Sequence, residues 1–169
     1  MKIDFYFVIF IYNKMSISVE IPSKIYPSGF LPNPEDYYIK HNVSIHEYKM
    51  HKYVYNSNIV NVPKIFNYDK KMKIMTLHKI MGMNLSDLYG ENIKDVPKKK
   101  IKGVREIIKI LTEYNIEYPD ITGYNFMLDK REKLWIIDFE HSKYNLNITD
   151  DYILSFCDGT NSSWNPDFT

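Results

Sequence analysis

The sequence predicts a single domain of the α+β class. Its 169 residues suit one domain of ordinary size, and 44% of them are hydrophobic, which is enough to bury a sizeable core. Short apolar segments broken by Pro and Gly predict strands in the N-terminal part, whereas apolar residues recur at helical spacing between Pro97 and Asn115. A hairpin pattern follows this helix. We therefore expect a mostly antiparallel sheet with a helical C-terminal part.

The N-terminal end contains one long apolar run, Phe5–Tyr12. Its eight residues are far fewer than the roughly 20 that a membrane-spanning helix needs, so we predict no membrane contact. A signal peptide is an alternative, but Asp4 adjoins the run and no small-residue cleavage site follows it. We expect either a buried strand or a translation start at Met15 instead of Met1.

The next segments alternate between strand and helix patterns. Residues 16–42 combine short apolar runs with turn residues and predict two or three strands. The residues Ser44–Glu47 form a capping-box pattern, in which a serine and a glutamate satisfy each other's backbone N–H groups. This pattern predicts a helix that continues to about Tyr55.

Residues 64–80 read as a β-hairpin that turns near Asp69 and Lys70. A short helix is expected at Asn84–Leu88. Pro97 suits the first position of the long amphipathic helix, because its missing N–H has no partner there in any case. The regular spacing of its apolar residues makes this helix the firmest of these predictions.

The segment from residue 116 to residue 142 contains the candidate chemistry. It reads as a short strand, a polar loop and a hairpin, with Asp120 and Asn125 in the loop and Asp138 at the end of the last strand. A hairpin whose strands start beside the loop and finish at Asp138 brings all three side chains to one end of the sheet. Two oxygen ligands and a carboxylate base suit Mg²⁺-assisted phosphoryl transfer.

The charges are distributed unevenly, although the net charge is only +1. Residues 1–109 contain 18 Lys and Arg against 10 Asp and Glu, whereas residues 110–169 contain 4 against 11. Clustered carboxylates repel one another unless a cation lies between them, so the acidic third is either a metal site or a solvated surface. The long helix carries a basic run that predicts either an RNA or acidic partner, or a solvated face: Lys98, Lys99, Lys100, Lys102, Arg105 and Lys109.

The segment 118–140 resembles the catalytic core of protein kinases, in which an HRD-x-x-x-x-N loop precedes a DFG triplet. Here the loop runs from Tyr118–Asp120 to Asn125, and the triplet is Asp138–Glu140. The loop is particularly similar to the D-L-S/T-x-x-N loops of the RIO kinases and of the small atypical kinase of the KEOPS complex. The strand end Ile137–Glu140 also resembles the I-D-F/Y-E sequence of choline kinases.

The resemblance covers about residues 16–145 and implies a two-lobed kinase-like fold with a reduced C-terminal lobe. We expect residues 16–80 to form the N-terminal lobe and residues 81–169 the C-terminal lobe, with ATP in the cleft. Lys40 ends a segment similar to the V-A-I-K strand, and Glu47 would be its partner. From the residues alone, Lys40 also suits an ordinary strand end and Glu47 a capping box.

The remaining roles follow from the same resemblance. Backbone around His78, Ile80 and Met81 would face the adenine as the hinge between the lobes. Asp120 would be the catalytic base. Asn125 and Asp138 would hold Mg²⁺ between the phosphates.

The sequence departs from the kinase pattern in four places. Gly29 is the only glycine before Gly82, so the Gly-rich loop is missing, and the His and Arg of HRD are Tyr118 and Pro119. Glu140 replaces the Gly of DFG. Only 29 residues follow Glu140, which leaves no room for an A-P-E segment.

We expect an atypical serine/threonine protein kinase that uses ATP and Mg²⁺. Two alternatives stay open: a small-molecule kinase of the choline or aminoglycoside type, and a pseudokinase that serves as a nucleotide-binding interaction module. A single cysteine, Cys157, can form no internal disulfide, so we expect a cytoplasmic protein.

Overall fold

The computed structural model describes residues 9–10, 17–18 and 34–168, and the chain forms two compact units, residues 1–37 and 38–169. In the first unit, β1 (Ile9–Phe10) pairs antiparallel with β2 (Ile17–Ser18). β1 lies within the apolar run at residues 5–12, which confirms strand structure for those two residues. The rest of this run, Gly29, and most of the expected strands before residue 34 lie outside the described residues.

A small sheet in the strand order β3-β5-β4 belongs to the second unit except for its first residue, Tyr37. Its strands are β3 (Tyr37–Lys40), β4 (Ile65–Asp69) and β5 (Ile74–His78). β4 and β5 form the expected antiparallel hairpin, and its turn is closed by the Asp69 carboxylate, which accepts the N–H groups of Lys71 and Met72 at 2.9 Å. This Asx-type turn explains why the hairpin forms where the sequence predicts it.

Helix α1 (Ile45–Ser57) connects β3 to β4. As predicted, Ser44 is its N-cap, because the Ser44 hydroxyl accepts the Glu47 N–H at 3.0 Å. Asn58 ends the helix in the left-handed conformation, with φ of 51°.

A small apolar cluster under this sheet positions the loop between β3 and α1. Val43 and Met75 are fully buried in it. The rings of Tyr48 and Tyr68 stack with centroids 4.3 Å apart, and the Tyr68 hydroxyl donates to the Val43 carbonyl at 3.0 Å. The loop between Lys40 and Glu47 is therefore held against the sheet.

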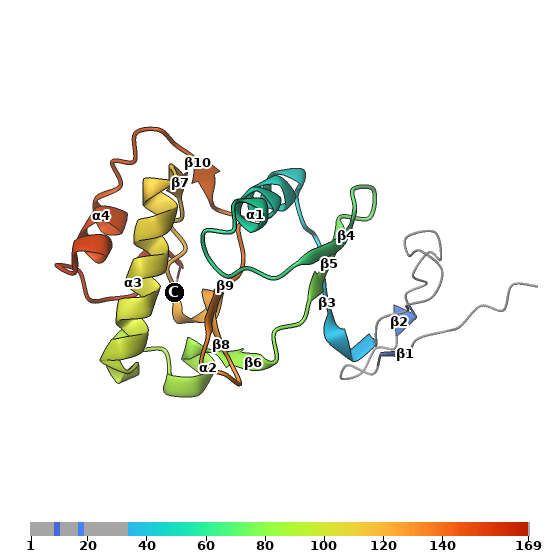
Figure 1. The fold of residues 1–169 in the computed structure, drawn as a ribbon, viewed down its shortest axis with the longest axis horizontal. Coiled ribbons are helices and arrows are strands. Elements are labelled where there is room, and N and C mark those ends of the chain that lie inside the picture. Colours follow the sequence, from blue (N-terminus) through green and yellow to red (C-terminus); the bar gives the residue numbers. More distant parts are fainter. Residues whose placement is uncertain (1–8, 11–16, 19–33, 169) are drawn as a thin grey trace, which may run out of the picture. The chain divides into compact units, whose positions relative to one another are not determined.

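The C-terminal part is built from three helices, a three-stranded antiparallel sheet in the order β6-β8-β9, and a two-stranded ladder of β7 and β10 (Figure 1). The helices are α2 (Leu85–Tyr89), α3 (Lys98–Glu113) and α4 (Asp151–Asp158). The strands are β6 (Gly82–Asn84), β7 (Ile116–Glu117), β8 (Phe126–Asp129), β9 (Leu134–Ile136) and β10 (Lys143–Tyr144).

Helix α3 supplies one wall of the main core. Its apolar stripe is buried as the spacing predicts, and Val104, Ile108 and Leu111 are fully inaccessible. Pro97 lies one position earlier than expected, at the N-cap, with φ of −54°. The helix ends at Glu113, two residues before the expected end, because Asn115 adopts the left-handed conformation with φ of 61°.

The basic run on α3 is only partly free to meet a partner. Lys100 is buried and its Nζ lies 3.3 Å from Glu132 Oε2. Arg105 donates to the Asn161 carbonyl at 3.1 Å and lies over the Phe156 ring. An RNA or acidic partner stays a prediction for the four exposed lysines, which are Lys98, Lys99, Lys102 and Lys109.

Helix α4 was not expected, although it has a clear sequence signature. Asp150 caps its start by accepting the Ile153 N–H at 3.0 Å, and Gly159 ends it with φ of 84°. Its buried residues Ile153 and Phe156 join the main core, and α4 lies beside α3 (Figure 1). Within the described residues, no helix is both long and apolar enough to cross a membrane.

Candidate active site

The loop after β7 is closed by hydrogen bonds between its two ends. Asn125, which is buried in a 3₁₀ turn, donates from Nδ2 to the Asp120 carbonyl at 3.1 Å. The Thr122 hydroxyl lies 3.4 Å from Asp120 Oδ1. The predicted loop residues Asp120 and Asn125 are thus brought together.

Asp138 follows β9 and lies next to this loop. The Ile137 N–H donates to the Asn125 carbonyl at 3.0 Å, which joins the two segments directly. We expected the strand to end at Asp138, but β9 ends at Ile136. The reason is that Asp138 has φ of 60°, a left-handed conformation that a strand cannot contain and that Asp tolerates better than most residues.

Lys40 forms two ion pairs that connect three separate elements. Its Nζ lies 2.7 Å from Glu47 Oε1 on α1 and 2.8 Å from Asp138 Oδ2. The Glu47 side chain is 2% exposed. Glu47 was predicted either to complete a capping box or to pair with Lys40. Its backbone N–H donates to Ser44, as in a capping box, but its carboxylate binds Lys40.

The pairing explains the protonation of these groups. Burial lowers the pKa of Lys40, but the hydrogen bonds and charges of Asp138 and Glu47 outweigh it and raise the pKa above the ordinary value. Burial raises the pKa of Glu47, and the Lys40 ammonium offsets part of that rise. Lys40 is therefore firmly cationic.

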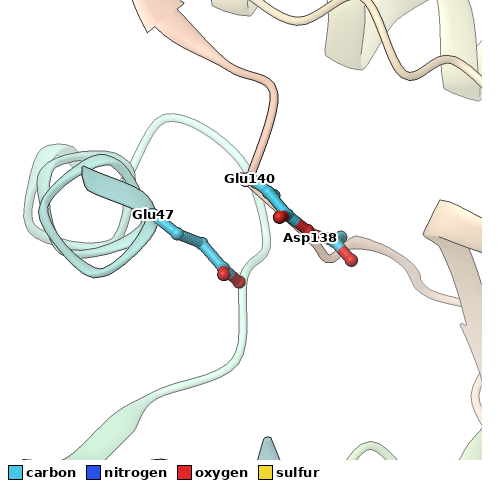
Figure 2. Close-up of side chains that lie close together, drawn as sticks. All are labelled: Glu47, Asp138 and Glu140. Carbon is cyan, nitrogen blue, oxygen red and sulfur yellow. The ribbon is translucent and has the colours of Figure 1, made fainter. Parts of the chain in front are cut away.

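Figure 2 shows Glu47 reaching from α1 toward the segment that carries Asp138 and Glu140. One carboxylate oxygen from each of these three residues lies within 4.8 Å of the others. Carboxylates this close repel one another, and Lys40 neutralises two of them. Glu140 is exposed, and its N–H donates to Asp138 Oδ1 at 3.2 Å.

The pKa of the Asp120 carboxyl group is raised above its ordinary value. Burial raises its pKa, and the negative charge of Asp138 adds to that rise, whereas hydrogen bonds from Asn125 and Thr122 oppose it. A carboxylate with a raised pKa is a better proton acceptor near neutral pH. The arrangement therefore suits a general base.

A cavity of about 320 Å³ lies beside the Lys40 ion pairs. Apolar side chains from the β3-β5-β4 sheet and the β6-β8-β9 sheet line this cavity, together with the predicted hinge residues His78 and Ile80. Met81 is absent from the lining, and its residue surface is 50% exposed. The lining residues are Tyr38, Lys40, Glu47, His51, Pro63, Met75, Leu77, His78, Lys79, Ile80, Gly82, Asn84, Met127, Ile137 and Asp138.

The buried His51, to which the sequence pattern assigned no role at the site, helps to hold the Asp138 segment in place. His51 on α1 bonds through Nε2 to the Pro63 carbonyl at 2.7 Å, and its ring contacts that of Phe139 at 5.3 Å. A carbonyl only accepts, so Nε2 carries the hydrogen, and burial lowers the pKa of His51 so that it is neutral. Contacts across the fold leave no local pattern in the sequence.

Tyr118, which stands where HRD has His, links the loop to the same segment. Its hydroxyl donates to the Ile137 carbonyl at 2.7 Å, and its ring meets that of Phe139 edge-on at 5.6 Å. The departure from HRD therefore preserves a connection between the loop and Asp138.

A model of the RIO domain family matches residues 34–148, which is more than half of the chain. The chain belongs to the RIO domain family. The match confirms the resemblance to reduced, atypical protein kinases and a kinase-like α+β fold. The division into lobes near residue 80 stays a prediction.

Further comparisons add little beyond the RIO domain. No curated protein matches the chain. Among solved structures it is similar to the kinase PK-1 of Cydia pomonella granulovirus, with 16% sequence identity and a TM-score of 0.48 over 68% of this chain. The chain spans 46% of that viral kinase.

One glycine in the RIO-type loop has no room for a side chain. A Cβ added at Gly123 would lie 2.4 Å from Ser86 Oγ and 3.2 Å from the Trp164 ring. We expect Gly123→Ala to destabilise the fold by about 1–3 kcal/mol through overpacking, measured by urea unfolding. In a Ser86→Ala background the cost should shrink, because the closest clash is gone. An equal cost in both backgrounds would contradict this account.

Proposed function

We propose that the chain is a Mg²⁺- and ATP-dependent phosphotransferase whose acceptor is a serine or threonine hydroxyl of a protein. The observation that carries the proposal is the position of Lys40, which is paired with both Glu47 and Asp138 beside the cavity. A cation held between these two carboxylates is placed to bind phosphate oxygens. RIO family membership supports the same chemistry, because RIO kinases generally use ATP and Mg²⁺.

The cavity suits a nucleotide in size and lining. Its volume of about 320 Å³ and side chains such as Met75, Leu77 and Met127 fit a flat, mostly apolar base. His78, Lys79 and Ile80 border the same space, and the resemblance to kinases implies that backbone here would face the edge of the base.

The donor set also fits Mg²⁺, which prefers oxygen ligands. Asp138 offers a carboxylate, and Asn125 offers its amide oxygen because its Nδ2 is used toward Asp120. When bound, the metal supplies positive charge to the phosphates.

Side chains of the protein itself bind the phosphates and take the proton of the acceptor hydroxyl. Glu47 holds Lys40 in place, and Lys40 binds the α- and β-phosphates. Asp120 orients the acceptor hydroxyl and takes its proton as the hydroxyl oxygen attacks the γ-phosphorus. The bond between the γ-phosphorus and the β–γ bridging oxygen breaks, and ADP leaves with that electron pair. RIO membership favours a protein acceptor, while a small alcohol and a pseudokinase without turnover are distinct outcomes of the test.

The test combines binding with transfer. ATP is titrated into the protein with Mg²⁺ and with EDTA, and transfer of the radiolabelled γ-phosphate is then followed to the protein itself, to a mixture of proteins, and to choline and an aminoglycoside. Metal-dependent binding with transfer to protein supports the proposal. Transfer to a small alcohol alone overturns the acceptor assignment, and binding without any transfer supports the pseudokinase instead.

We expect a chain that starts at Met15 to bind ATP as the full chain does. Every residue that lines the cavity is at position 38 or later, within the second unit. Thermal shift with Mg²⁺-ATP compares the two chains. A truncated chain that is insoluble or unfolded would instead show that Phe5–Tyr12 contributes to the core.

A further inference from the structure

The segment after α4 returns to the catalytic loop and binds it through Asn165. The Asn165 residue is 4% exposed. Its Nδ2 donates to the Pro119 carbonyl at 2.7 Å, and its backbone N–H donates to the Ile121 carbonyl at 3.0 Å. These two carbonyls belong to the residues on either side of Asp120, so one residue holds both neighbours of the candidate base.

The surrounding contacts hold Asn165 itself in one orientation. Its Oδ1 accepts the Asp167 N–H at 3.1 Å, so both ends of the side-chain amide are used. The preceding Trp164 is 6% exposed and packs close to Gly123 in the same loop. The Phe168 ring lies 5.0 Å from that of His141. The tail is therefore anchored before and after Asn165.

We propose that Asn165 is a positioning residue for the phosphotransfer reaction, acting through the backbone on either side of Asp120. The inference rests on the proposed function, in which Asp120 takes the proton of the acceptor. Asp120 lies in a loop outside any strand or helix, so no sheet ladder holds its backbone. Rotation of the flanking peptide groups would move the carboxylate, and a shift of about 1 Å at a reacting group can cost about 100-fold in rate.

The chemistry of the contact requires a neutral donor. A carboxylate at position 165 would face the Pro119 carbonyl with a lone pair and would add charge beside a loop that carries Asp120. Asn165→Asp therefore removes the donated hydrogen bond with almost no change in shape, while the backbone bond to Ile121 is retained. Asn165→Ala removes the side chain without adding charge.

Asn161 provides a matched control in the same tail. Its Oδ1 accepts from the N–H and the hydroxyl of Ser163, so its side-chain bonds stay within the tail. The experiment measures transfer kinetics with Mg²⁺-ATP, thermal unfolding, and amide hydrogen exchange at residues 120–122 for the wild type, Asn165→Asp, Asn165→Ala and Asn161→Ala.

We expect kcat to fall about 10–100-fold in both Asn165 variants, with the KM for ATP within about twofold of the wild type. Exchange at residues 120–122 should become faster in these variants only. The proposal is overturned if the kcat of Asn165→Asp is no lower than that of Asn161→Ala. It is also overturned if the fraction of unfolded protein accounts for the whole loss of kcat. If the wild type itself transfers no phosphate, the proposed function fails, and unchanged exchange in the Asn165 variants would separately overturn the positioning role.

Discussion

Replacing Asp120 by Asn is expected to slow phosphoryl transfer by about 10²–10⁴-fold while ATP affinity stays nearly unchanged. The amide side chain introduced at position 120 cannot take the proton of the substrate hydroxyl, so the activation barrier of phosphoryl transfer rises by roughly 3–5 kcal/mol. Asp120 is absent from the lining of the cavity, so nucleotide contacts should survive. Single-turnover transfer and an ATP titration measure the two effects separately.

Asp150→Asn is the matched control for this substitution, because Asp150 caps α4 away from the site and Asn caps nearly as well. It should alter neither binding nor transfer. If Asp120 only stabilises its loop, Asp120→Asn should cost about 1 kcal/mol or less in stability and leave activity in place. That result would remove the assignment of Asp120 as the base.

Replacing Asp138 by Asn is expected to abolish the Mg²⁺-dependent part of ATP binding. The substitution removes a carboxylate ligand and one of the two charges that pair with Lys40. Asn tolerates the left-handed conformation at this position, where φ is 60°, so the backbone should keep its shape. Thermal shift should show stabilisation by ATP in the wild type only when Mg²⁺ is present, and none in the variant.

The neighbouring Glu140 offers a control within the same cluster of three acidic residues (Figure 2). Glu140 is exposed and has no ion pair with Lys40 among the described residues. We expect Glu140→Gln to retain most of the Mg²⁺-dependent shift. If Glu140→Gln abolishes the shift and Asp138→Asn does not, the metal ligand has been assigned to the wrong carboxylate.

Local patterns in the sequence determined the elements whose stability is largely local. The Ser44 cap, the Asp69 turn and the apolar stripe of α3 depend on residues within one or two turns of each other, so their chemistry is readable along the chain. The loop from Asp120 to Asn125 was equally visible, because its spacing is a feature of the chain itself. Helix α4 was missed although Asp150 and Gly159 mark its ends.

The tertiary structure alone decided which of these residues meet. Folding brings together the residues of three contacts at the site. These are the ion pair between Lys40 and Asp138, the ring contact between His51 and Phe139, and the hydrogen bond from Asn165 to the Pro119 carbonyl. Strands β6 and β10 are two or three residues long and exist only through pairing with β8 and β7. Such contacts form because packing brings distant segments together, and their strength depends on burial and geometry, which no periodicity or spacing in the sequence encodes.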